Sequence, residues 1–185
     1  APTSAATQQR MTSGFKGTGG RMALGYGLTE SAGVGTHNWG ELLEAHPNSV
    51  GRVFPGIEMS IRDDNNQELP NGEQGEICIR GSCVMLGYWR NPQATYKSIA
   101  PGRWLRTGDV GRLDASGIFL LGRESDVINV FGMKVVPSEV EEVLVALPGV
   151  VEAKVYSGRR PDNTQFVKAA IVAPGLTPAQ LREYC

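Results

Sequence analysis

The feature that most restricts the fold is the stretch 50–122, where short runs of alternating apolar and polar residues are separated by glycines and other turn residues. The runs are IEMSIRD, GEICIRG and GIFLLGR, and the segment DDNNQELPNGEQG joins the first two. Alternation is typical of strands that bury one face, and clusters of Gly, Asn, Asp and Pro mark the turns between them. The stretch therefore predicts an antiparallel β-subdomain in the form of a distorted barrel.

The pattern changes after Asp126, where a smaller unit is expected. VINVFGMKVV predicts a hairpin that turns near Gly132, VVEAKVYSG and FVKAAIVAP predict paired strands, and Thr177-Pro178 opens a helix. The predicted fold class is therefore α+β. A β-barrel-like part of a large domain over 1–125 is followed by the start of a small α+β C-terminal domain over 126–185, and both domains are incomplete.

Two further helices are expected. Pro137 opens one of them and Pro148-Gly149 ends it, because proline suits the first turn of a helix and glycine its end. Residues 2–16, rich in Thr, Ser, Ala and Gln, predict another with a Thr or Ser cap. The apolar face of the helix after Pro137 is predicted from residues at helical spacing, Val140, Val143, Leu144 and Leu147.

The composition argues against several classes of function. A net charge of -1 and a pI near 6.2 give no electrostatic reason to expect nucleic acid or an anionic membrane as a partner. No run of about 18 apolar residues is present, so no transmembrane segment is expected. Three cysteines favour a reducing compartment over a disulfide framework. The expected location is cytoplasmic, with any targeting segment outside these residues.

The first motif with chemical potential is GYGLTESAG, from Gly25 to Gly33. A glycine-rich turn lets backbone amides approach a phosphate, and a hydroxyl such as that of Thr29 can donate to it. The carboxylate of Glu30 suits Mg²⁺, and an aromatic ring such as that of Tyr26 can stack on a base. In isolation Gly-Tyr-Gly is more often just a turn, and that alternative stays open.

The second motif is RTGDVGRLDASG, and GRESD follows it. Asp109 is expected at the end of a strand, where a carboxylate can accept both hydroxyls of a ribose. Arg123 offers a planar, permanently charged donor to a ribose or phosphate. The plainer alternatives are that Asp109 satisfies a turn and that Arg123 pairs with Asp126 on the surface.

The third motif is FGMK, which places Gly132 in a tight turn. A hairpin that needs positive φ explains this glycine, and so does a thin ligand that passes beside the backbone. His37 and His46 have no acid and nucleophile at an informative spacing, and no Cys/His metal pattern is present.

Each motif is weak alone, but their order is specific. YGLTE, GEICIRGSCVMLGYW, RTGD and GRESDVINVFGMKVVPSEVE follow one another here as they do in the adenylate-forming superfamily of acyl-CoA synthetases, luciferases and peptide-synthetase adenylation domains. The chain resembles this superfamily over essentially its whole length. The 1–125 region then corresponds to the end of the large AMP-binding domain, and 126–185 to the start of the small lid domain.

The resemblance implies a reaction and a set of ligands. Members of the superfamily join a carboxylic acid to ATP, giving an acyl-adenylate, and then pass the acyl group to a thiol, usually that of coenzyme A. Fatty or aryl acids are the implied substrates, and ATP, AMP, Mg²⁺ and coenzyme A the implied cofactors. DVINVFGMKVVPSEVE resembles acyl- or aryl-CoA ligases more than amino-acid adenylation domains.

The resemblance also assigns residues of the large domain. Tyr26 packs on the adenine, and Gly25 and Gly27 flank it in the nucleotide-binding loop. Thr29 bonds the α-phosphate and Glu30 holds Mg²⁺, so these two carry the catalytic assignment.

The remaining assignments concern the ribose and the small domain. Asp109 and Arg123 hold the ribose hydroxyls, Asp126 is the hinge on which the small domain turns, and Gly132 lies beside the pantetheine arm. Two positions depart from the usual pattern, since Asn129 stands where many relatives carry Lys, and Ile118 where many carry Tyr.

The resemblance places a phosphate loop upstream of these residues and an adenylation-promoting lysine downstream of them. The chain opens on APTSAATQQRM and closes on LREYC, and we expect both ends to be cuts through a longer protein. The 185 residues by themselves are expected not to catalyse adenylation. Two other readings stay open, an adenylation domain that loads a carrier protein and a non-catalytic nucleotide-binding remnant. The oligomeric state is not predicted.

Overall fold

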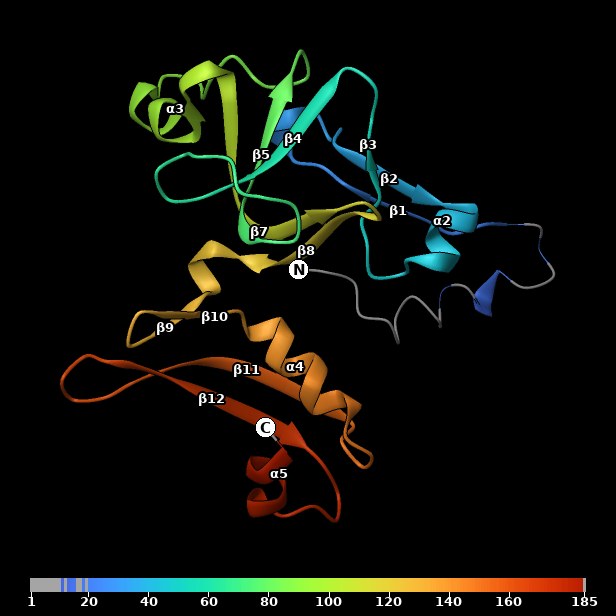
Figure 1. Ribbon diagram of the computed structural model, residues 1–185, viewed down its shortest axis with the longest axis vertical. Coiled ribbons are helices and arrows are strands. Elements are labelled where there is room, and N and C mark those ends of the chain that lie inside the picture. The colour runs from blue at the N-terminus through green and yellow to red at the C-terminus, as the bar shows by residue number, and fades with distance from the viewer. Residues whose placement is uncertain (1–10, 12, 16–17, 19, 185) are drawn as a thin grey trace. The chain divides into compact units, whose positions relative to one another are not determined.

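The computed structural model describes residues 11, 13–15, 18 and 20–184. The chain divides into two compact units, Ala1–Leu120 and Leu121–Cys185 (Figure 1). Most of the helix expected over 2–16 lies outside the described residues. The boundary expected between 125 and 126 rests on the hinge assigned to Asp126 and stays a prediction.

The first unit contains a small antiparallel sheet. Its order is β1-β2-β3, and Tyr26 at the end of β1 pairs with Thr36 at the start of β2. β1 continues through Gly25 and Tyr26, which corrects the expectation that the chain enters a loop at Gly25. The elements are β1 (Ala23–Tyr26), the 3₁₀ turn η1 (Thr29–Ser31), β2 (Thr36–Trp39), α2 (Gly40–Ala45) and β3 (Arg52–Val53).

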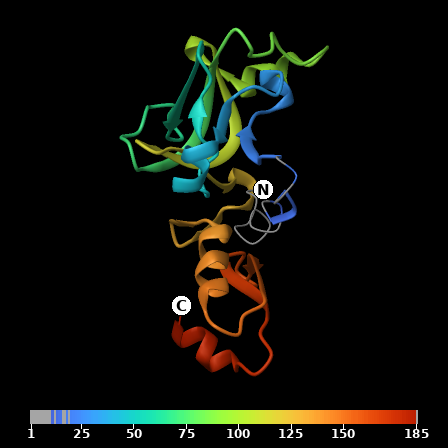
Figure 2. The ribbon, with the colours of Figure 1, turned by 90° about the vertical axis from the view of Figure 1, so that its right-hand side faces the viewer.

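A curled five-stranded sheet forms the body of the first unit, as the alternating runs predicted (Figure 1, Figure 2). Its order is β4-β5-β7-β6, and β8 pairs with the long strand β7. The pairs β4–β5, β5–β7 and β6–β7 are antiparallel. The strands are β4 (Ile57–Arg62), β5 (Gln74–Gly81), β6 (Ile99–Ala100), β7 (Trp104–Asp114) and β8 (Gly117–Arg123).

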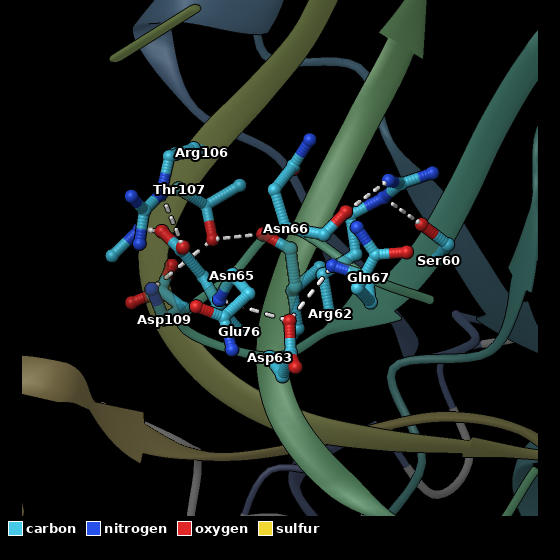
Figure 3. A network of polar contacts seen from close by, with 12 residues as sticks. Ser60, Arg62, Asp63, Asn65, Asn66, Gln67, Glu76, Arg106, Thr107 and Asp109 are labelled. Carbon is cyan, nitrogen blue, oxygen red and sulfur yellow. Dashed lines mark hydrogen bonds and ion pairs between the residues drawn. The ribbon is translucent and has the colours of Figure 1, made fainter. Parts of the chain in front are cut away.

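The turn after β4 illustrates how local chemistry sets the hairpin. The side chain of Asp63 accepts hydrogen bonds from the backbone N–H groups of Asn65 and Gln67, at 2.9 and 2.7 Å (Figure 3). Such a carboxylate replaces backbone partners within the turn. Asn66 takes positive φ, which asparagine tolerates better than most residues.

The core of the first unit joins the two sheets. Ile77 and Ile79 on β5, Leu105 on β7 and Ile118 on β8 are at most 1% exposed. Ile118, one of the two positions expected to depart from the superfamily's usual pattern, is therefore a core residue. The full buried cluster consists of Tyr26, Ile61, Ile77, Ile79, Val84, Leu105 and Ile118.

A short helix, α3 (Pro92–Ser98), follows β5 and was not predicted from the sequence. Asn91 caps it by accepting a hydrogen bond from the Ala94 N–H at 3.0 Å, and Pro92 occupies its first turn. Thr95 on this helix accepts a hydrogen bond from the Tyr88 N–H at 2.9 Å. The helix therefore fixes the loop that carries Tyr88. A 3₁₀ turn, η2 (Pro101–Arg103), leads into β7.

The second unit has the α+β pattern expected after Asp126. The hairpin turns at Phe131 and Gly132, and the longer strands pair antiparallel over their whole length. Its elements are η3 (Glu124–Asp126), β9 (Ile128–Val130), β10 (Met133–Val135), α4 (Pro137–Ala146), β11 (Glu152–Arg159), β12 (Gln165–Val172) and α5 (Pro178–Tyr184).

Its core is smaller than that of the first unit. Ile128, Leu144 and Val155 are buried, and Val140 packs against them. Val143, predicted on the apolar face of α4, is 48% exposed. The prediction failed there because this narrow sheet of two strands covers only one stripe of the helix. In the described part of the chain, none of the helices is long and apolar enough to cross a membrane.

Candidate functional site

The centre of the candidate site is a bulge in β7 that carries Asp109. Glu76 on β5 pairs with Val110 and Cys78 pairs with Arg106, so three residues of β7 oppose the single residue between them. Asp109 therefore lies inside β7, not at a strand end as the sequence predicted. Bulges of this kind turn side chains away from the regular alternation of a strand.

Three side chains hold the bulge in shape (Figure 3). The Thr107 hydroxyl donates to the Ile77 carbonyl at 2.7 Å and accepts from the Asp109 N–H at 3.1 Å. The carboxylate of Glu76 accepts from the Gly108 N–H at 2.9 Å and from Arg106 Nε at 2.7 Å. These contacts replace backbone ladder bonds that the bulge interrupts.

Tyr26 and Asp109 meet in the interior of the first unit. The Tyr26 hydroxyl donates to Asp109 Oδ2 at 2.7 Å, and the two residues are 8% and 4% exposed. They are 83 residues apart in the sequence, and both were predicted to bind the nucleotide. A carboxylate offers about four acceptor positions, and the Tyr26 hydroxyl occupies one of them.

The position of Tyr26 follows from the small sheet. Its backbone N–H donates to the Thr36 hydroxyl at 3.2 Å, and that hydroxyl donates to the Val50 carbonyl at 2.6 Å. A Cβ on Gly27 would lie 2.4 Å from the Gly33 carbonyl oxygen, and one on Gly25 would lie 3.1 Å from that of Thr36. Gly27 is thus needed for the loop to fold against itself, whatever it contacts in a complex.

Thr29 and Glu30 lie on the 3₁₀ turn η1 directly after β1. Thr29 is exposed, and Glu30 is half-buried. Glu30 Oε1 accepts a hydrogen bond from the Tyr88 hydroxyl at 2.8 Å, and its backbone carbonyl accepts from the Met85 N–H at 2.8 Å. The hydrogen bond to Glu30 raises the pKa of Tyr88 above its ordinary value, because the carboxylate stabilises the protonated phenol.

Glu30 offers a single carboxylate to a magnesium ion. Among the described residues, no group of three or more His, Cys, Asp and Glu side chains could hold a metal ion. Mg²⁺ is commonly held by one or two carboxylates together with substrate phosphates and water. A single carboxylate on an accessible turn fits an ion that arrives with the phosphates, and does not fit a permanently bound ion.

The other three predicted residues lie in the second unit. Arg123 ends β8 and is exposed, and Asp126 ends η3, where its Oδ1 accepts from the Ser125 hydroxyl at 3.1 Å. Gly132 has φ +89, and a Cβ built on it meets nothing within 4 Å. Asn129 Oδ1 accepts a hydrogen bond from the Gly132 N–H at 2.8 Å, so Asn129 shapes this turn.

Two site residues were not singled out from the sequence, Glu76 and Tyr88. Glu76 begins the apolar run of β5, and a lone acid in a strand that becomes buried is a signal for a specific partner. Its partners lie 30 and 32 residues further along, and no local pattern connects them. Tyr88 lies in the MLGYW segment and offered no separate signal.

Comparison with known proteins places these features in a family. Residues 1–89 match the family model described as AMP-binding enzyme. The long-chain-fatty-acid–CoA ligase of Escherichia coli O6:H1 is 38% identical over 171 residues, which cover 91% of this chain and 30% of that protein. The 4-coumarate–CoA ligase-like 6 protein of Arabidopsis thaliana is 38% identical over 150 residues, covering 80% and 26%.

A solved structure of an adenylating enzyme resembles this chain over its whole length. ATP-bound MatB from Rhodopseudomonas palustris superposes with a TM-score of 0.84 at 32% identity, covering 100% of this chain and 37% of that one. The chain therefore belongs to the AMP-binding enzymes of the adenylate-forming superfamily, as the order of its motifs predicted. It spans about 30% of the length of the Escherichia coli ligase.

Proposed function

We propose that the gene product carrying this chain is an ATP-dependent acid–CoA ligase, and that the first unit supplies the ribose-binding side of its nucleotide site. The observation that carries the proposal is the buried hydrogen bond between Tyr26 and Asp109, which joins two family motifs. The named relatives are acid–CoA ligases by name and are 38% identical to this chain over the matched residues.

Asp109 is the proposed acceptor for the ribose hydroxyls. A carboxylate held by the bulge and by the Tyr26 hydroxyl enters the complex already oriented, so little side-chain entropy is lost on binding. The Tyr26 ring contributes to the core and leaves 8% of the residue exposed. Its proposed contact with adenine is therefore an edge or part of one face, and not a fully open platform.

Thr29 and Glu30 are the proposed partners of the phosphates. In the first half-reaction a carboxylate oxygen of the acid attacks the α-phosphorus, and the bond to the pyrophosphate leaving group breaks. Negative charge grows on the α-phosphate oxygens, and the exposed Thr29 hydroxyl can donate to them. Mg²⁺ held by Glu30 and the phosphates would supply positive charge there.

The second unit carries the proposed residues for the thioester step. In that step the thiol sulfur attacks the acyl carbon, the bond to AMP breaks, and AMP leaves. Arg123 is the proposed second donor to the ribose, and Asp126 the proposed hinge. Gly132 is the proposed passage for the pantetheine arm, because its side of the turn holds no atoms within 4 Å of a Cβ.

The acid is proposed to be a fatty or an aryl acid. This proposal rests on the relatives, which are named for long-chain fatty acid and 4-coumarate. The acyl pocket itself is not assigned to any residue of this chain.

The test is product formation by the purified gene product that carries these residues. ATP and coenzyme A are supplied with a panel of fatty, aryl and amino acids, and AMP and the thioester are quantified by mass spectrometry. We expect AMP and thioester in equal amounts with a fatty or aryl acid. Products from amino acids alone, or no products from folded protein, would overturn the proposal.

The acceptor is tested in the same assay. Coenzyme A is replaced by a phosphopantetheine-loaded carrier protein, with pantetheine as a small-molecule control. Faster transfer to coenzyme A supports the CoA ligase, and faster transfer to the carrier protein supports a loading enzyme. Tight binding of AMP without turnover would identify a non-catalytic nucleotide-binding protein.

A further inference from the structure

We infer that Glu76 is a positioning residue for nucleotide recognition, which sets the β7 bulge so that Asp109 faces the ribose. This inference rests on the proposed function. Glu76 is not expected to touch the nucleotide, since both of its carboxylate oxygens are engaged by β7. Its effect is transmitted through the backbone of Gly108 to the next residue, Asp109.

Glu76 contacts β7 at two positions, one before the bulge and one within it. Oε2 accepts from Arg106 Nε before the bulge, and Oε1 accepts from the Gly108 N–H at its apex. The side chain is 7% exposed and that of Arg106 34%. A buried carboxylate must be paired to be tolerated, and these two donors pair it.

The bulge needs such a clamp because its backbone is unusual. Gly108 has φ +69, a conformation that lacks the ladder bonds of a regular strand. Thr107 anchors one end of the bulge to the Ile77 carbonyl. Glu76 sets the direction of the Gly108 N–H, because its Oε1 accepts the hydrogen bond from that group. Rotation of that peptide would turn the backbone N–H of Asp109 away from the Thr107 hydroxyl, and would move the Asp109 carboxylate with it.

Residue 76 needs a charged carboxylate and a side chain long enough to contact both donors, Arg106 Nε and the Gly108 N–H. Glutamine has the same shape but offers one acceptor oxygen, and its NH₂ group would face one of the two donors. Aspartate keeps the charge but is one methylene shorter, so it cannot reach both donors. Glu76→Gln therefore removes one of the two bonds with little change in volume.

The experiment measures the dissociation constants of ATP and 2′,3′-dideoxy-ATP by calorimetry, on the gene product that carries this chain. Wild type is expected to prefer ATP, and Asp109→Ala to lose that preference. Glu76→Gln is expected to raise the dissociation constant of ATP about tenfold, which is the effect of one charge-assisted hydrogen bond. The dissociation constant of dideoxy-ATP should change by less than about twofold. In the Asp109→Ala background, Glu76→Gln should have no further effect on either nucleotide.

The matched control is Glu58→Gln. Glu58 lies on the neighbouring strand β4 and pairs with Arg80, as Glu76 pairs with Arg106. Among the described residues its hydrogen bonds go to Arg80 and not to the bulge. Its substitution is expected to leave the preference for ATP unchanged. A general loss of stability would weaken the binding of both nucleotides. A positioning role would weaken only the binding of ATP, which carries the ribose hydroxyls.

The outcomes separate the two proposals. If wild type binds both nucleotides equally, the ribose site proposed for Asp109 is wrong. If wild type and Asp109→Ala behave as expected but Glu76→Gln keeps the preference for ATP, the positioning role alone is wrong. If Glu76→Gln does not fold, Glu76→Asp is measured instead and should show the same selective loss of ATP affinity.

Discussion

Two glycine turns, one in each unit, show how differently the same backbone conformation can be supported. Gly108 and Gly132 both have positive φ, +69 and +89, and a Cβ on either would meet nothing within 4 Å. Gly108 lies in a bulge of a central strand, held by the buried Glu76. Gly132 lies in an exposed hairpin, where its N–H donates to the side chain of the exposed Asn129.

The difference shows which candidate residues are held by the fold of their own unit. Asp109 is 4% exposed and hydrogen-bonded to a core tyrosine, so its position is set by the fold of the first unit. Arg123 at the end of β8, Asp126 in η3 and Gly132 in the hairpin turn are exposed residues of the second unit. Preorganised residues lose little conformational entropy when they bind a ligand, whereas exposed residues can change their contacts more easily.

The largest expected effects come from the two cores. Ile77→Ala and Ile128→Ala each remove a side chain that is 0% exposed, and each is expected to cost about 2–5 kcal/mol of unfolding free energy. The three tryptophans, Trp39, Trp89 and Trp104, all lie in the first unit. Urea unfolding followed by tryptophan fluorescence should therefore detect Ile77→Ala, and circular dichroism should detect both.

This pair of substitutions tests whether the units unfold separately. Leu86→Ala, at a residue 90% exposed, is the control and should be nearly neutral. An equal shift of the tryptophan transition by Ile128→Ala and Ile77→Ala would show that the chain unfolds as one cooperative body.

The glycine turns give the next largest effect. Gly108→Ala and Gly132→Ala place a Cβ at positive φ, and each is expected to lower the unfolding free energy by about 1–2 kcal/mol. Their effects on function should differ. Gly108→Ala should weaken ATP binding, while Gly132→Ala should slow thioester formation and leave pyrophosphate exchange intact. Equal effects on both half-reactions would remove the functional distinction between the turns.

Tyr26→Phe is expected to have a moderate effect. It removes the hydroxyl that bonds Asp109 but keeps the ring in the core. The lost bond is worth about 1 kcal/mol, which corresponds to roughly fivefold weaker ATP binding in a titration. Tyr96→Phe, at a tyrosine that is 86% exposed, is the matched control. ATP affinity equal to that of wild type would show that the hydroxyl does not orient Asp109.

The smallest effect concerns the pKa of Tyr88. Its hydrogen bond to Glu30 raises that pKa, so the bond stabilises the fold below the unfolded pKa near 10 and is lost as pH rises through the higher folded value. Because Tyr88 is 38% exposed, the contribution to stability is small. NMR titration of labelled tyrosine should show the raised pKa, and Glu30→Gln should lower it. No change in the Glu30→Gln protein would mean that another contact sets the pKa.

Alternation predicted much of the fold because the strands 57–62 and 117–123 carry it in their own residues. It could not predict the bulge, because a bulge is a relation between two paired strands. Asp109 was placed at a strand end for this reason, since Gly108 in the sequence signals a break. The break is real, but β7 continues beyond it.

The sequence predicted part of the candidate site and missed part of it. The motifs identified Tyr26 and Asp109, and the structure brings these two together. Glu76 was missed because its partners are distant in sequence and become visible only when β5 and β7 are paired. The short helix α3 was missed although Asn91-Pro92 is a reasonable start signal, because its seven residues are too few to show periodicity.

The most direct test of the central claim is carboxylate-dependent ATP–pyrophosphate exchange by the gene product that carries this chain, with Asp109→Ala as the comparison. Exchange requires the nucleotide site and the acid but not coenzyme A, so it isolates the half-reaction assigned to the first unit. We expect exchange with a fatty or aryl acid and a loss of at least about tenfold in apparent ATP affinity in Asp109→Ala. Undiminished exchange in the variant would contradict the assignment of the ribose to Asp109, and the absence of exchange with every acid would contradict the ligase itself.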